Sequence, residues 1–170
     1  MDFRDVVKLG LDEYMRDLRK ALDGLTAEER RFQPGPESHH IDYTVWHMAR
    51  VEDSWMNRGI RRGDQIWNRD GWDKKLGLSE RDNGFGYTAE QVTGLPTFDL
   101  DEIMSYYSAV RADALELIDS LTDADLEKVP NPERNPDYTI ARVFSHLMIE
   151  EAQHVGQIAY LRGLQRGMGK

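Results

Sequence analysis

Apolar residues recur at spacings of three and four along most of this chain, which is the period of one face of an α-helix. The first such segment covers about residues 2–22 and ends before Gly24, a common helix stop. Its apolar positions are Phe3, Val6, Val7, Leu11, Tyr14, Met15, Leu18 and Leu22. A short acidic helical turn at residues 25–32 follows, and Pro34 and Pro36 interrupt the pattern.

Three further helices are predicted, at about residues 38–61, 99–121 and 139–166. Asp99 and Thr139 are suited to cap the last two, because their side-chain oxygens can accept hydrogen bonds from the first N–H groups of a helix. Four long helical patterns without convincing strand alternation predict an all-α four-helix bundle, and we expect one domain over residues 1–170.

The connection between the second and third helices, residues 63–96, is too long for a simple loop. It combines six glycines, Gly63 included, with aromatic side chains, so we expect an ordered flap with one short helix, packed on the bundle through Trp67 and Trp72. Asp-Tyr-Thr occurs both at 42–44 and at 137–139. This weak repeat places the second and fourth helices in corresponding positions, where their inner faces can meet.

Composition narrows the classes of function. The net charge of −9 repels phosphate backbones, which argues against nucleic-acid binding. No apolar run is long enough to span a membrane, and the N-terminal residues do not resemble a signal peptide, so we expect a cytoplasmic protein. Because the chain has no cysteine, a bound metal must be held by histidine, carboxylate or backbone oxygen.

The fourth helix presents His146, Glu150 and His154 at steps of four residues. One step rises about 6 Å and turns about 40°, which one ion can bridge, whereas two steps rise about 12 Å. Spacing therefore allows His146 with Glu150, or Glu150 with His154. His47 on the second helix would complete a site of two imidazoles and one carboxylate, suited to Zn, Ni, Fe or Mn.

Simpler interpretations exist for the same residues. Glutamate and histidine four apart often form an ordinary surface pair, and His47 beside Trp46 is compatible with a hydrogen-bonded core histidine. Spacing alone does not choose between these interpretations and a metal site.

Four segments of the chain, residues 44–55, 66–78, 99–115 and 145–164, resemble the DinB-like family of metal-dependent four-helix bundles. This family includes thiol-dependent S-transferases and mycothiol-dependent isomerases. The resemblance covers nearly the whole chain and is most specific in the segment SHLMIEEAQHVGQIAYLRGL, residues 145–164.

The resemblance implies the metal ligands His47, Glu150 and His154. Many members of the family have histidine in place of Glu150, and the mycothiol-linked branch resembles this chain in having glutamate. His146 matches a family histidine that is usually not a ligand. A carboxylate in place of an imidazole lowers the net charge of a divalent site by one unit and suits harder metals.

The resemblance also implies an enzyme that acts on a small electrophile, with a low-molecular-weight thiol as cosubstrate. Two alternatives use the same ligands: a metal-dependent hydrolase of a small amide or ester, and a non-catalytic, stress-related metal-binding bundle. The resemblance further suggests a homodimer, for which the second helix offers Val51, Trp55 and Met56.

Weak catalytic candidates flank the predicted ligands. Tyr43 and Arg50 share roughly the helical face of His47, and Gln153 lies beside His154. Tyr43 is suited to donate a proton, but an aromatic at this spacing more often serves packing. Arg50 is suited to bind an anionic substrate, but we expect it to pair with a surface acid such as Glu52 or Asp53.

Overall fold

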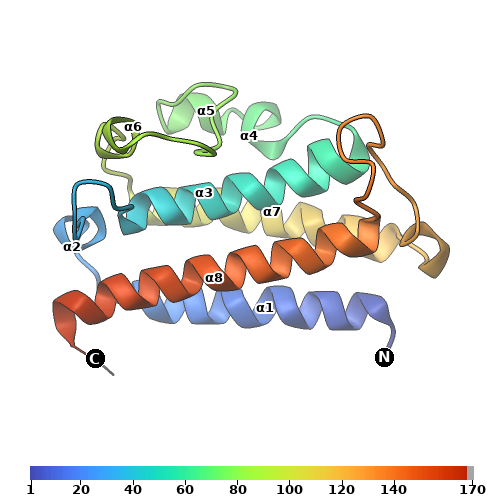
Figure 1. Cartoon of the computed structure of the whole chain (residues 1–170), viewed down its shortest axis with the longest axis horizontal. Helices are drawn as coiled ribbons and strands as arrows, with labels where there is room; N and C mark the ends of the chain where they lie inside the picture. The colour runs from blue at the N-terminus through green and yellow to red at the C-terminus, as the bar shows by residue number, and fades with distance from the viewer. Residues whose placement is uncertain (168–170) are drawn as a thin grey trace.

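Four long helices run side by side along the molecule (Figure 1) in the computed structural model, which describes residues 1–167. They are α1 (Phe3–Leu22), α3 (Ile41–Asp53), α7 (Leu100–Ser120) and α8 (Ile140–Arg166). α1 packs against α8, and α3 packs against both α7 and α8. Residues 1–167 contain no strand, so the predicted all-α four-helix bundle is confirmed.

The predicted caps of the last two long helices are confirmed, while the second helix begins at Ile41, a few residues after the predicted start. Asp99 caps α7 by accepting the N–H groups of Asp101 and Glu102, and Thr139 caps α8 by accepting that of Arg142. The second long helix also differs at its other end, because after Asp53 it continues as the π-helical segment η1 (Ser54–Arg61). Among residues 1–167, no helix has both the length and the apolar character of a membrane span.

The remaining helices are single turns. They are α2 (Ala27–Arg31), α4 (Ile66–Arg69), α5 (Trp72–Lys75), α6 (Ala89–Thr93) and the 3₁₀ turn η2 (Asp123–Asp125). The flap between η1 and α7 holds α4, α5 and α6, so the prediction of one short helix there was wrong. Helices of four or five residues are too short to show an apolar period in the sequence.

The flap lies along the side of α3 that faces away from α1 (Figure 1). Together with α7 and α8 it buries every residue of α3, charged ones included. Each buried carboxylate of α3 has an arginine partner: Asp42 with Arg30, Glu52 with Arg111, and Asp53 with Arg50. Such pairing is required because an isolated buried charge would cost several kcal/mol.

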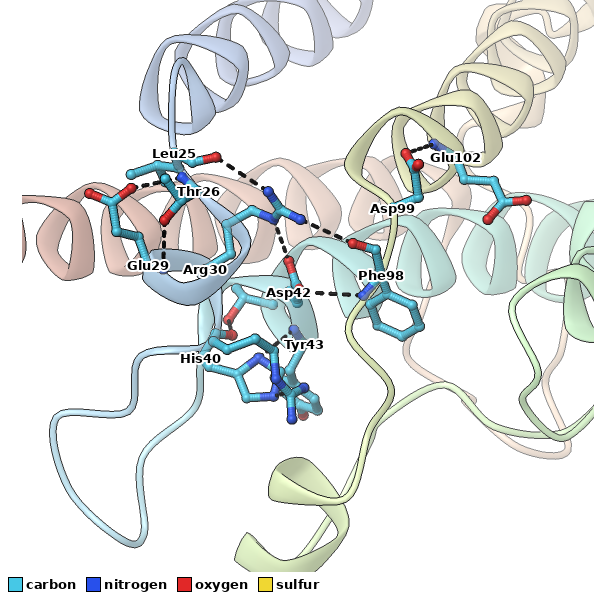
Figure 2. Close-up of polar contacts among 12 residues, drawn as sticks. Leu25, Thr26, Glu29, Arg30, His40, Asp42, Tyr43, Phe98, Asp99 and Glu102 are labelled. Carbon is cyan, nitrogen blue, oxygen red and sulfur yellow. Dashed lines mark hydrogen bonds and ion pairs between the residues drawn. The ribbon is translucent and has the colours of Figure 1, made fainter.

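The Arg30–Asp42 pair joins three segments that are distant in sequence (Figure 2). Arg30 Nε donates to Asp42 Oδ1 at 2.8 Å, and the same guanidinium donates to the carbonyls of Leu25 and Phe98. The second oxygen of Asp42 accepts the N–H of Phe98 at 3.3 Å. This pair fixes α2 and the start of α7 against α3.

Asp53 attaches the flap to the end of α3. Its carboxylate accepts the backbone N–H groups of Ile66 and Trp67, both at 2.9 Å, and so caps α4 from a distance. It also accepts the hydroxyl of Tyr106 at 2.8 Å. Trp67 is buried next to Trp46 and Tyr106, which packs the flap onto the bundle.

The apolar residues of the second helix that suggested a homodimer are used within the chain. Val51 and Met56 are buried, and Trp55 stacks on Tyr138 with ring centroids 5.3 Å apart. These three side chains therefore do not form a free face. The homodimer stays a prediction, and this face of the second helix no longer supports it.

Replacing Asp53 with alanine should lower the free energy of unfolding by about 3–5 kcal/mol. Arg50 would lose its carboxylate partner, and the buried N–H groups of Ile66 and Trp67 would lose their acceptor. Urea denaturation measures this. Asp17→Ala, on the exposed surface of α1, is the control and should change stability by less than about 0.5 kcal/mol. Equal effects in the two variants would contradict the assigned role of Asp53.

His40 should make the stability of the fold depend on pH. As the N-cap of α3 its Nδ1 accepts the N–H of Tyr43 at 3.0 Å (Figure 2), which requires an unprotonated Nδ1. Burial, with the charge of Arg31 nearby, lowers the pKa of His40 to about 4. The unfolded chain has a histidine pKa of about 6.5 and binds the proton first. The stabilising contribution is therefore complete above about pH 6.5 and is lost as the pH falls towards about 4.

Asparagine at position 40 also caps a helix but does not titrate. Between pH 7 and pH 5 the wild-type chain should lose about 2 kcal/mol more stability than His40→Asn. Urea denaturation at both pH values gives the comparison. The same loss in both proteins would show that His40 is not the group that titrates.

Candidate metal centre

The predicted ligands come together where α3 crosses α8. One potential ligand atom of each of His47, Glu150 and His154 lies within 4.8 Å of the other two. The His47 and His154 rings are nearly perpendicular, with centroids 5.2 Å apart, and His154 Nε2 lies 4.0 Å from Glu150 Oε1. The bundle thus gathers two residues of one helix and one of another, which are about 100 positions apart in sequence.

Hydrogen bonds at the far side of each ring set the tautomer of both histidines. His47 Nδ1 lies 2.5 Å from the carbonyl oxygen of Asn83, and His154 Nδ1 lies 2.9 Å from Oε1 of Gln157. Because both partners are acceptors, each Nδ1 carries the hydrogen and each Nε2 keeps its lone pair. Metal-binding histidines in proteins are commonly oriented in this way.

The other histidine of α8, His146, orients Glu150. Its Oε2 lies 3.0 Å from His146 Nε2, while Oε1 faces His154. The His146 ring in turn meets Trp55 and Tyr138 edge to face, with centroids 5.5 and 5.8 Å away. Of the two pairs that spacing allowed, Glu150 and His154 are the pair grouped with His47, and His146 holds the other oxygen of Glu150.

Burial keeps His47 in the form that binds metals. It lowers the pKa of His47 to about 4, the positive form of His154 disfavours protonation further, and only the hydrogen bond to Asn83 opposes this. The ring is therefore neutral at pH 7, with its Nε2 lone pair available. Tyr43 stacks on it in parallel, with centroids 5.6 Å apart.

Three successive carbonyls of the flap accept hydrogen bonds from one face of α3. The carbonyls of Asp82, Asn83 and Gly84 accept from Arg50, His47 and Tyr43, respectively. The contact needs glycine at position 84, where φ is +81° and a Cβ atom would lie 3.0 Å from His47 Nδ1. Sequence reasoning missed Asn83 and Gly84, although glycines at 84 and 86 signalled an unusual turn.

The expected surface position of Arg50 was wrong. Its side chain is 1% exposed, and the guanidinium donates to Asp53, to the carbonyl of Asp82 and to Tyr106. It also lies over the Trp67 ring, 4.5 Å from the centroid. The helical face was identified correctly, but the flap covers the part of α3 where Arg50 lies. Its acid partner is Asp53, in the interior.

The other two weak candidates lie nearer the ligands. Tyr43 is buried and its hydroxyl donates to the carbonyl of Gly84 at 2.9 Å, while burial raises its pKa. Gln153 is exposed on α8 and borders a cavity beside His154. Catalytic roles for Tyr43, Arg50 and Gln153 stay predictions.

Two cavities adjoin the predicted ligands, with volumes of about 260 and 630 Å³, and of the two only the larger is bordered by His154. Both are bordered by His47, Phe85, His146 and Glu150. The smaller one extends towards η1 and the loop before α8, and the larger one towards Tyr43 and Gln153. Phe85 is 85% exposed at the boundary. The ligand group is therefore reachable by small molecules from two sides.

The residues fit a divalent transition metal. Two neutral imidazoles and a carboxylate are ordinary ligands for such ions. Within residues 1–167 the group has three members. Structural zinc sites usually have four protein ligands, so this arrangement leaves coordination positions for small molecules.

The family model described as the DinB superfamily matches residues 11–158. The crystal structure of a conserved protein from Enterococcus faecalis superimposes with a TM-score of 0.87 at 21% sequence identity, covering 100% of this chain and 99% of that one. This likeness shows a shared fold. No curated protein matches the chain.

Replacing Gly84 with alanine should weaken zinc binding by roughly 10- to 100-fold, because the new Cβ atom displaces the His47 ring or its carbonyl partner. Gly86→Ala is a matched control: its φ is +73°, but a Cβ atom there meets nothing within 4 Å. Competition with a chromophoric chelator measures both affinities. If both variants bind zinc equally weakly, backbone strain and not the contact with His47 would explain the effect.

Proposed function

The chain belongs to the DinB superfamily, and we propose that its His47, Glu150 and His154 bind one divalent transition-metal ion, Zn, Ni, Fe or Mn. The observation that carries this proposal is the pair of Nδ1 hydrogen bonds, which turns the lone pairs of both imidazoles away from Asn83 and Gln157. With the Nδ1 hydrogens used in this way, both Nε2 atoms keep the lone pair that a metal ligand needs, and the two histidines lie together with Glu150.

We further propose that the protein is an enzyme that joins a low-molecular-weight thiol to a small electrophile, or isomerises the electrophile with the help of the thiol. When bound, the ion supplies a Lewis acid that lowers the pKa of a thiol, so that the reactive thiolate forms at neutral pH. The chain contains no cysteine, so the thiol has to come from a small molecule.

The two cavities support a reaction between two molecules. They meet at the same side chains, so a thiol in one and an electrophile in the other would face each other across the ligand group. Each wall has a distinct role: His146 keeps Glu150 in place, and the flap carbonyls hold His47. Such fixed positioning removes much of the entropic cost of bringing two reactants together.

Elemental analysis of protein purified without a histidine tag tests the metal site. Wild-type protein should contain about one divalent ion per chain, and His47→Ala and His154→Ala should contain little, because each removes one of three ligands. His39→Ala is the control, since His39 is exposed, borders the larger cavity and is not a member of the group. Wild-type protein that binds no divalent ion at neutral pH would end the proposal.

Trial reactions with and without added thiol distinguish the possible activities. For the transferase, we expect the protein to consume a bimane electrophile only when 2-mercaptoethanol is present. The His154→Ala variant should lose this activity. Hydrolysis of p-nitrophenyl acetate without thiol would indicate the hydrolase instead. If neither occurs and Glu150→Ala strongly lowers the melting temperature of the metal-loaded protein, the ion has a structural role.

A further inference from the structure

The smaller cavity leads from the ligand group to two arginines. Arg58 lies in η1 and Arg134 in the loop before α8, and both border the cavity and are exposed. The remaining wall is formed by neutral side chains and the glutamate ligand. Among these wall residues are Val51, Ser54, Trp55, Asn83, Asn131, Asn135 and Glu150.

Neither arginine is neutralised by an acid. Within residues 1–167, Arg58 and Arg134 form no ion pair, whereas neighbouring Arg61 pairs with Asp113 and Arg50 with Asp53. Glu150 is the one acid in the cavity wall, and its oxygens face His146 and His154. In a chain of net charge −9, this cavity is thus a local region of positive charge.

The π-helical segment η1 contributes Arg58 to this wall. A π-helical turn holds more residues than an α-helical turn, and such segments often occur at functional sites. Along η1, Ser54, Trp55, Arg58 and Gly59 border the cavity, so one face of this segment forms part of the wall.

The element that carries Arg134 is held in place against η1. Tyr138, from the same loop, stacks on Trp55 with an interplanar angle of 11°. The turn itself is closed by hydrogen bonds from the N–H groups of Arg134 and Asn135 to the carbonyl of Asn131. The two arginine-bearing segments therefore lie against each other in the wall, and the side-chain amides of Asn131 and Asn135, from the same loop as Arg134, are further donors there.

We propose that this cavity binds an oxyanion, a carboxylate or a phosphate, carried by the small substrate of the enzyme, with Arg58 and Arg134 as its ligands. The proposal rests on the proposed function, because it takes the reacting end of that substrate to lie at His47 and Glu150. A volume of about 260 Å³ suits a compact organic acid or phosphate ester. Guanidinium groups bind both kinds of oxyanion through paired N–H donors.

Calorimetric titration at low ionic strength tests the proposal with three probes: succinate, inorganic phosphate and the neutral succinamide. Each is added to metal-free protein and to zinc-loaded protein. We expect binding of at least one anion and none of succinamide. Arg58→Gln and Arg134→Gln should each weaken anion binding by about tenfold. Arg16→Gln, which removes the same charge from the exposed surface of α1, should leave it unchanged.

The outcomes separate this proposal from that of the metal site. The oxyanion proposal is supported if both arginine variants weaken anion binding. This holds for binding by metal-free protein, even if elemental analysis finds no metal, and for binding that requires zinc. The oxyanion proposal is overturned if neither the metal-free nor the zinc-loaded protein binds an anion. It is also overturned if either arginine variant binds the anion as tightly as the wild type, as would happen if zinc alone held the anion. Preference for succinate or for phosphate identifies the chemical source of the oxyanion. A shift of the Trp55 indole N–H signal in NMR spectra on addition of the probe would show that the probe occupies this cavity.

Discussion

Complete burial of α3 is the constraint on which the rest of the structure depends. A helix that presents Asp42, His47, Arg50, Glu52 and Asp53 to the interior is stable only if each of these groups has a hydrogen-bonding partner. The partners come from everywhere else in the chain: from α2, from α7 and, above all, from the flap. The flap therefore belongs to the core of the fold, because its backbone accepts hydrogen bonds from buried side chains that would otherwise need water as a partner.

The candidate metal centre follows from the same constraint. The carbonyl of Asn83 that satisfies buried His47 also decides which ring nitrogen faces Glu150 and His154. Its neighbours on the flap accept from Arg50 and Tyr43, so the ring orientation is fixed by a row of contacts. On α8 the ligands are half-buried and border the cavities, where solvent and small molecules have access. One side of the site is thus rigid and the other is open, as binding of an external molecule requires.

The four long helices and their capping residues were predictable because they depend on local periodicity and on side chains next to the helix ends. The meeting of His47 with the α8 pair was predictable only by family resemblance, since spacing left two ligand pairs open. Two features were out of reach. The π-helical turn after Asp53 leaves no mark in the apolar pattern, and the burial of Arg50 depends on a segment about 30 residues away. Both arise from tertiary contacts that the local sequence does not encode.

Glu150 and Glu151 show how much of the chemistry is set by surroundings rather than by residue type. They are adjacent and identical, yet they lie on different faces of α8. Glu151 is completely buried, bonded to the Tyr107 hydroxyl at 2.9 Å, and burial together with the charge of Glu52 raises its pKa well above the usual value. Glu150 borders both cavities and pairs with His146. One carboxyl group is therefore enclosed in the core, where burial disfavours its charged form, and the next is open to the cavities beside the two histidines. The face of α8 on which each glutamate lies, combined with the position of α3, therefore decides that Glu150 is the one grouped with His47 and His154.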